Sequence, residues 1–177
     1  MMLKPQDVVV TLKLLLCPGK RPSFSQLGHD LSMSASEVHA SVKRARAARL
    51  LMDSETGVKP NVTALKEFLL HGIKYAFPAV RGELSRGMPT SYAAPPLNSQ
   101  ISPGNDPPPV WPDPEGTVRG FSLVPLYSSV PKAAKRDGDL YELLTLIDAL
   151  REGRARERNF AAVELVKRLR VRNHAAA

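Results

Sequence analysis

The sequence has a single cysteine and no long apolar run. Cys17 has no second cysteine in the 177-residue chain to form a disulfide with, and no set of Cys and His residues has zinc-site spacing. A bilayer-spanning helix needs about 20 apolar residues. Residues 8–16 are apolar, but Lys13 interrupts them and no small-residue cleavage site of a secretory signal follows. We therefore expect a cytoplasmic protein that does not enter a membrane.

Signatures of catalysis and of nucleotide binding are missing as well. The four histidines (His29, His39, His71 and His174) are scattered, with no carboxylate or cysteine at catalytic or metal-binding spacing. The chain has neither a P-loop nor a G-x-G-x-x-G motif. We expect no enzymatic activity, no cofactor and no metal site.

What the chain has is positive charge, and that charge is unevenly distributed. The net charge is +8 and the sequence pI is about 9.9, which favours a polyanionic partner. Residues 1–52 hold eight Lys or Arg and three Asp or Glu, leaving +5 in under a third of the chain. The alternative is a basic surface that binds nothing.

Composition divides the chain into three segments. Residues 1–76 have helix-period apolar spacing and few prolines, whereas residues 77–136 hold 12 of the 16 prolines. Residues 137–177 return to an apolar helical pattern rich in arginine. We expect a DNA-binding domain, a proline-rich arm or linker, and a C-terminal helical hairpin that serves dimerisation or partner binding.

The first segment predicts two short helices joined by a tight turn. A helix is expected over residues 5–16, and two capping boxes follow it, Ser23 with Gln26 and Ser34 with Glu37. Each box marks the start of an amphipathic helix. Two such helices, joined by three or four residues, match the helix-turn-helix pattern.

A hairpin and a fourth helix are predicted next. Residues 50–53 and 58–59 are expected to be two short strands around a turn at residues 54–57. Asn61 is a good N-cap for a helix that ends before Pro78. The hairpin would be the wing of a winged helix.

The stretch SFSQLGHDLSMSASEVHASVKRARAARLL, followed by this hairpin, resembles the winged helix-turn-helix of MarR-type and related bacterial regulators. The resemblance covers roughly residues 5–75, and the remainder resembles only bacterial proteins of unassigned function. Many such wings carry arginine near the tip, whereas this tip reads SETG and offers only Lys59. The resemblance implies a DNA-binding protein whose second helix of the pair enters the major groove.

Residues 35–48 would form this recognition helix, with Val38, Val42 and Ala45 on its inner face. The outer face would present Lys43 and Arg44 to guanine or phosphate, and the helix N-terminus would suit a phosphate. Alternatively, the basic run over residues 43–49 is only a solvated face. The predicted DNA-binding residues are Ser23, Ser25, Ser34, Ser36, His39, Ala40, Lys43, Arg44 and Lys59, with Lys20 and Arg21 as further backbone contacts.

The proline-rich segment leaves more alternatives open. Its prolines favour extended backbone, which suits either a flexible linker or an arm that packs on its own chain or on a partner subunit. Its aromatic residues favour the arm. A ligand site at Trp111, in a metabolite-sensing regulator, is a further hypothesis.

Residues 137–172 predict two helices. Asp139 and Glu142 have cap-like spacing, and the arginines of this segment either contact phosphate or pair with nearby acids. A hairpin this small is not stable alone, so its apolar stripe must pack on the first domain or on a second copy. The stripe consists of Leu140, Leu143, Leu144, Ile147 and Leu150, of which Leu144 and Ile147 are expected to be buried.

The fold class expected is mainly α, a winged helix-turn-helix with a two-stranded wing, a proline-rich extended arm and a C-terminal helical pair. The leading functional hypothesis is a homodimeric, sequence-specific transcriptional regulator, a repressor, that binds double-stranded DNA. The alternative is a protein-interaction module, antitoxin-like or an adaptor, that binds a partner protein through residues 137–172.

Overall fold

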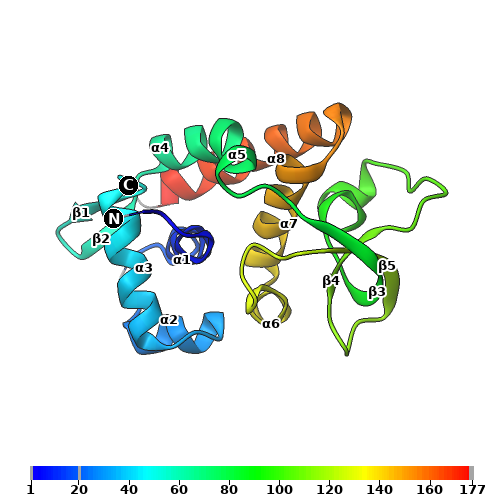
Figure 1. The fold of residues 1–177 in the computed structure, drawn as a ribbon. Coiled ribbons are helices and arrows are strands. Elements are labelled where there is room, and N and C mark those ends of the chain that lie inside the picture. The colour runs from blue at the N-terminus through cyan, green and yellow to red at the C-terminus, as the bar shows by residue number, and fades with distance from the viewer. Residues whose placement is uncertain (1, 20, 176–177) are drawn as a thin grey trace.

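The structure is a computed structural model that describes residues 2–19 and 21–175. It is mainly α-helical, as predicted, with one two-stranded hairpin and one three-stranded sheet in the described part. Figure 1 shows the first helix, α1 (Pro5–Leu15), in the middle of the molecule. On one side lies α3 (Ala35–Ala47), and on the other lies α7 (Gly138–Glu152).

Helix α1 is enclosed on nearly every side. Val8, Val9 and Val10 are all fully buried, as is Thr11, so the buried surface of the helix is wider than a single apolar stripe. Three consecutive valines point in three directions around a helix, so each needs a different neighbour. The helix contacts α2, α3 and α7, and the apolar core that surrounds it draws residues from all three compositional segments.

The first segment folds as its capping residues predict. Asn61 accepts a hydrogen bond from the backbone N–H of Ala64 at 3.2 Å and begins the fourth helix. The hairpin strands are antiparallel. The first begins one residue later than expected, and the second has four residues in place of the expected two. In chain order the elements are α2 (Phe24–Leu31), α3, β1 (Leu51–Ser54), β2 (Gly57–Pro60), α4 (Val62–Glu67), the π-helical turn η1 (Phe68–Gly72) and α5 (Ile73–Ala76).

The proline-rich segment is folded onto its own chain. Strand β3 (Arg81–Pro89) is antiparallel to β4 (Pro109–Pro112) and to β5 (Val118–Leu123), and β4 and β5 pair in parallel, so the sheet closes on itself. A Cβ on Gly120 would lie 1.9 Å from the carbonyl oxygen of Pro108, so only glycine allows this closure. The sequence did not predict this sheet. Two short 3₁₀ turns, η2 (Ser91–Ala93) and η3 (Leu97–Ser99), follow β3.

The C-terminal segment consists of α7 and α8 (Ala155–Ala175), preceded by α6 (Val130–Arg136) at the end of the proline-rich segment. Leu144 and Ile147 are buried, as predicted. The stripe to which they belong packs within its own chain, and this removes the argument that required a second copy. The expected cap of α7 was wrong, because Asp137, not Asp139, accepts a hydrogen bond from the backbone N–H of Leu140.

A buried carboxylate in α7 ties the proline-rich segment to the C-terminal helices. Asp148 is 1% exposed and accepts hydrogen bonds from the Trp111 indole N–H at 2.6 Å and the Thr90 hydroxyl at 2.7 Å. Arg151 donates to the same carboxylate at 2.7 Å and also to the carbonyl of Phe77. Burial raises the pKa of Asp148, and the Arg151 charge and the three hydrogen bonds oppose that rise.

The surroundings of Trp111 argue against the hypothesis of a ligand site at this residue. The Trp111 side chain is 1% exposed, its N–H is taken by Asp148, and its ring lies 5.8 Å from that of Tyr141. No face of the indole is open to a ligand. Trp111 is therefore a core residue that fixes β4 against α7.

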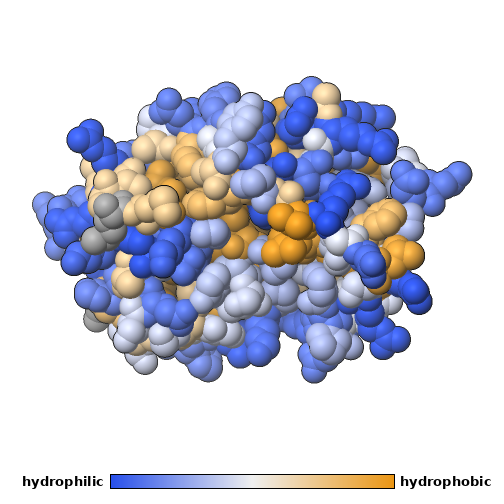
Figure 2. All heavy atoms as spheres, in the orientation of Figure 1, coloured by the Kyte–Doolittle hydropathy of each residue, from blue (hydrophilic) through white to orange (hydrophobic). Residues whose placement is uncertain are grey.

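On the face shown in Figure 2, hydrophilic side chains cover much of the surface, and more hydrophobic atoms are visible at the upper left, near the centre and toward the right. The exposed apolar residues include Val80 and Val124, which meet where the N–H of Val124 donates to the carbonyl of Val80. Within the described ranges, every helix is too short or too polar to cross a membrane.

We predict that Asp148→Ala lowers the free energy of unfolding by about 3–5 kcal/mol, because it leaves the buried Arg151 charge unpaired. The Trp111 and Thr90 donors would also lose their acceptor. Chemical denaturation measures this loss. Glu55→Ala, which removes an exposed carboxylate at the hairpin tip, is the matched control and should change stability by less than about 0.5 kcal/mol. Equal stability of the two variants would show that Asp148 does not hold these elements together.

Candidate nucleic-acid interface

The helix pair α2–α3 is joined by a turn that depends on one glycine. Ser32 ends α2 with a left-handed backbone (φ 54°), and Met33 donates its N–H to the carbonyl of Gly28 at 2.9 Å. A Cβ on Gly28 would lie 2.6 Å from the carbonyl oxygen of Met33. Any other residue at position 28 would push the two helices apart. The sequence analysis did not single out Gly28, although a glycine inside a helical pattern signals a close approach of this kind.

The outer face of α3 carries the predicted polar residues. Val38, Val42 and Ala45 are buried against the core, as expected, while Ser36, His39 and Lys43 are exposed and Ala40 is half-buried. Lys43 makes no hydrogen bond or ion pair with any residue that the structure describes. Its ammonium group is therefore available to an external acceptor.

Arg44 does not point outward, and this prediction was wrong. Its Nη2 and Nε donate to both carboxylate oxygens of Asp7 on α1, at 2.6 to 3.1 Å, and Nη2 also reaches Ser41 at 3.2 Å. Asp7 is fully buried and Arg44 is 14% exposed. The hydrogen bond to Asp7 raises the pKa of Arg44 above its already high ordinary value. Arg44 thus anchors α3 to α1 and is unavailable to DNA.

The N-terminus of α3 is closed by a capping box. Ser34 accepts from the N–H of Glu37 at 3.2 Å, and the Glu37 carboxylate accepts from the N–H of Ser34 at 2.9 Å. The other Glu37 oxygen accepts from the Tyr127 hydroxyl at 2.6 Å, and the hydrogen bonds from Tyr127 and Ser34 hold the pKa of Glu37 below its ordinary value. The Ser34 hydroxyl therefore serves as a cap, and the N–H groups of Ser34 and Glu37 are engaged within the chain. The expected phosphate site at this helix end stays a prediction.

A row of three side chains runs from the hairpin turn to α3. The Arg21 guanidinium lies 4.5 Å from the centre of the Phe24 ring, which meets the His39 ring edge-on at 5.1 Å. The Arg21 side chain also lies beside the hairpin turn, where a Cβ on Gly57 would come 3.3 Å from it. Arg21 Nη2 has no hydrogen-bond partner in the described part of the chain. The sequence analysis considered Arg21 but missed its stacking on Phe24.

The remaining predicted contacts flank this row. Ser23 accepts from the N–H of Gln26 at 3.1 Å as the cap of α2, and Ser25 is exposed in the first turn of that helix. On the hairpin, Lys59 is exposed opposite Met52. The structure therefore brings most of the predicted residues to one region, around α3. Lys20 lies outside the described residues.

The hairpin is attached to α3 by an exposed ion pair. Arg46 Nη2 lies 2.6 Å from Asp53 Oδ2, with both side chains more than half exposed. Such a pair contributes at most about 1 kcal/mol, so it aligns the hairpin only weakly. It also neutralises Arg46, which leaves Lys43 and Lys59 as the positive charges that face outward from α3 and the hairpin.

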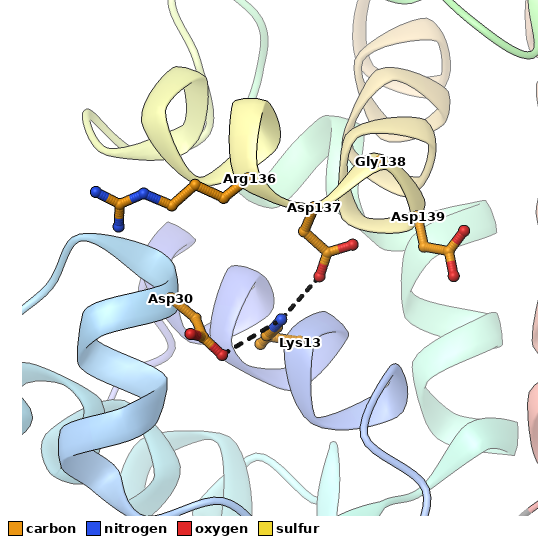
Figure 3. A pocket seen from close by; sticks show the side chains of 6 residues that line it. All are labelled: Lys13, Asp30, Arg136, Asp137, Gly138 and Asp139. Atoms are coloured by element: carbon orange, nitrogen blue, oxygen red, sulfur yellow. Dashed lines mark hydrogen bonds and ion pairs between the residues drawn. The ribbon is translucent and has the colours of Figure 1, made fainter.

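A polar cleft of about 360 Å³ lies behind the helix pair. Figure 3 shows Lys13 of α1 reaching between Asp30 of α2 and Asp137 at the start of α7. The ammonium is 2.8 Å from Asp137 and 3.5 Å from Asp30. Burial alone would lower the pKa of Lys13, but both carboxylates raise it. The cleft therefore contains an ion cluster that joins α2 to α7 through α1.

No family model, curated protein or solved structure matches this chain. Among the described residues there is also no group of three or more His, Cys, Asp or Glu residues that could hold a metal ion.

Replacing Arg44 with alanine should lower the free energy of unfolding by about 3–5 kcal/mol, because it leaves the Asp7 carboxylate buried without its partner. Lys43→Ala removes the neighbouring charge on the same helix and should cost less than about 0.5 kcal/mol. Urea denaturation of the two variants gives both values. If both variants unfold like the parent, Arg44 is not the anchor of α3.

The Tyr127–Glu37 hydrogen bond should make stability depend on pH. A carboxyl whose pKa is lowered by folding stabilises the fold above its ordinary pKa and loses that effect as the pH falls through its folded value. Tyr127→Phe should therefore destabilise by about 1 kcal/mol at neutral pH, since Glu37 is partly open to solvent. The difference should shrink in acid, where Glu37 is protonated. Denaturation curves at both pH values test this, and a difference that grows in acid would contradict it.

Proposed function

We propose that this protein is a sequence-specific DNA-binding regulator of transcription, built on a winged helix-turn-helix in which α3 reads the major groove. The observation that carries the proposal is the outer face of α3. That face is exposed, free of large apolar residues, and centred on the unpaired Lys43. A helix that enters the major groove needs such a face, with small side chains for close approach and a cation or hydroxyl at the base edges.

Each part of the region has a role in this proposal. Ser36, His39 and Lys43 face the base edges, and Ala40 lets the helix approach closely. Arg21 and Lys59 lie on either side and bind phosphates, together with the first turn of α2. The basic excess of residues 1–52 supplies the long-range attraction to the duplex.

Each chain has one DNA-reading helix pair in this proposal, α2–α3. A homodimer would present two such pairs about 34 Å apart, or a multiple of that distance. The leucine stripe of α7, which motivated the homodimer, is buried within the chain. A dimer would therefore have to form through a different surface. Repression would depend on the position of the bound DNA site relative to the gene.

Lys43→Ala should weaken binding of a cognate duplex by about 1–3 kcal/mol if Lys43 contacts a base. The cognate site is first selected from a random duplex pool, and binding is then titrated at several salt concentrations. Lys66→Ala is the matched control, because Lys66 is an exposed lysine on α4 without a partner among the described residues.

The titration distinguishes three cases. Loss of affinity for the cognate duplex alone supports a base contact, and equal loss on every duplex, with a lower salt slope, supports a phosphate contact. If Lys43→Ala binds every duplex as Lys66→Ala does, α3 does not read DNA and the proposal fails.

A further inference from the structure

A groove on the exposed side of α8 has an apolar floor. Its volume is about 580 Å³, and it is lined by Phe160 and Val163 and by Gln100, the residue that follows the 3₁₀ turn η3. Val163 is 55% exposed, which is unusual for a valine in the middle of a helix. Pockets of this size accept several apolar side chains. In Figure 1, the start of α8 lies beside α7, away from α2 and α3.

Unpaired arginines lie in and near this groove. In residues 155–171 there are five basic and two acidic side chains, a net of +3. The two acids are already engaged, Glu157 by the N–H of Arg154 and Glu164 by neighbouring basic side chains. Arg156 and Arg170 form no ion pair within the described part of the chain. Unpaired positive charge therefore lies in the groove at Arg156, and on α8 at Arg170, one turn beyond the groove residue Lys167.

A second copy of this chain is a poor occupant. Arg156 lies seven residues before Val163 and Arg170 seven residues after it, so all three share one face of the helix. If two copies of α8 crossed antiparallel about a two-fold axis at Val163, Arg156 of one copy would lie beside Arg170 of the other. Like charges at both ends would repel. The positive charge on this face of α8 therefore favours a negatively charged partner.

We propose that the α8 groove binds an acidic amphipathic helix of another protein. The apolar face of that helix lies on Phe160 and Val163, and its carboxylates face Arg156 and Arg170. This is the helix-in-groove mode of recognition, in which apolar anchors supply affinity and flanking charges fix orientation. The inference does not depend on DNA binding, because none of these residues belongs to the α3 face.

The test uses a synthetic helical peptide of about 15 residues, with leucines at i, i+3, i+4 and i+7 and glutamates elsewhere. A twin peptide carries lysine in place of each glutamate. Fluorescence anisotropy measures binding of both to the full chain. The acidic peptide should bind and the lysine twin should not.

Three variants then locate the binding. Val163→Asp and Arg156→Glu should each weaken the acidic peptide at least about tenfold. Arg119→Glu makes the same change in net charge as Arg156→Glu, at an exposed, unpaired arginine on β5, and should stay within about twofold of the parent. Because Val163 and Arg156 are exposed, both variants should keep the melting temperature of the parent.

Several outcomes would overturn the proposal. Absence of acidic-peptide binding, or equal binding of the two peptides, would rule out recognition of an acidic helix. Equal weakening by Arg156→Glu and Arg119→Glu would leave only a general charge attraction. A parent dimer that becomes monomeric in Val163→Asp would identify a second copy as the occupant. Loss of duplex DNA affinity in Val163→Asp would make the groove a nucleic-acid surface instead.

Discussion

The complete burial of α1 is the constraint on which the rest of the structure depends. A helix with three consecutive buried valines cannot lie on the surface of a single domain, so elements from both ends of the chain must cover it. Helix α1 also carries a fully buried polar residue, Asp7. A buried carboxylate needs a partner, and Arg44 supplies it with two nitrogen donors. The same ion pair fixes how α3 is rotated about its axis, and thereby which of its side chains face solvent.

A second buried carboxylate has the corresponding role in the other half of the chain. Asp148 accepts hydrogen bonds from Trp111 on β4, from Thr90 directly after β3, and from Arg151 in the next turn of α7. The Trp111 and Thr90 donors come from segments whose own secondary structure is short or irregular. A three-stranded sheet with prolines in two of its strands has few hydrogen bonds of its own, so attachment to a rigid helix sets its position.

The sequence predicts well what is encoded locally. Ser23, Ser34 and Asn61 cap the helices that they were expected to cap, because a cap depends on residues within one turn. Arg44 could not be placed in this way. Successive residues on a helix differ by about 100°, so Lys43 lies on the outer face of α3, whereas Arg44 lies close to the boundary of the buried face. The side on which Arg44 falls depends on Asp7, which is 37 residues earlier in the chain.

The closed sheet could not be predicted for a related reason. Its pairing requires Gly120 to approach the carbonyl of Pro108 and Trp111 to reach Asp148, and neither contact leaves a periodic pattern in the sequence. A proline-rich composition is as typical of a linker as of short strands closed by tertiary contacts. Apolar and aromatic residues in that segment were the only signal that it packs.

The proposed reading face is held by parts of the chain far from it in sequence. Tyr127 binds Glu37 at the start of α3, Arg136 donates to the carbonyl of His29 at 2.5 Å, and Lys13 links α2 to α7. These contacts join the helix pair to α1, to α6 with the residues before it, and to the start of α7. A face held in this way loses little further freedom on binding, which favours affinity and selectivity. Helix α7 packs directly against α8 and also contacts α1, which holds α3. A partner bound in the α8 groove would therefore contact a helix that packs against this set of elements. Any coupling between the two surfaces would have to pass through α1 and α7, since these helices join them.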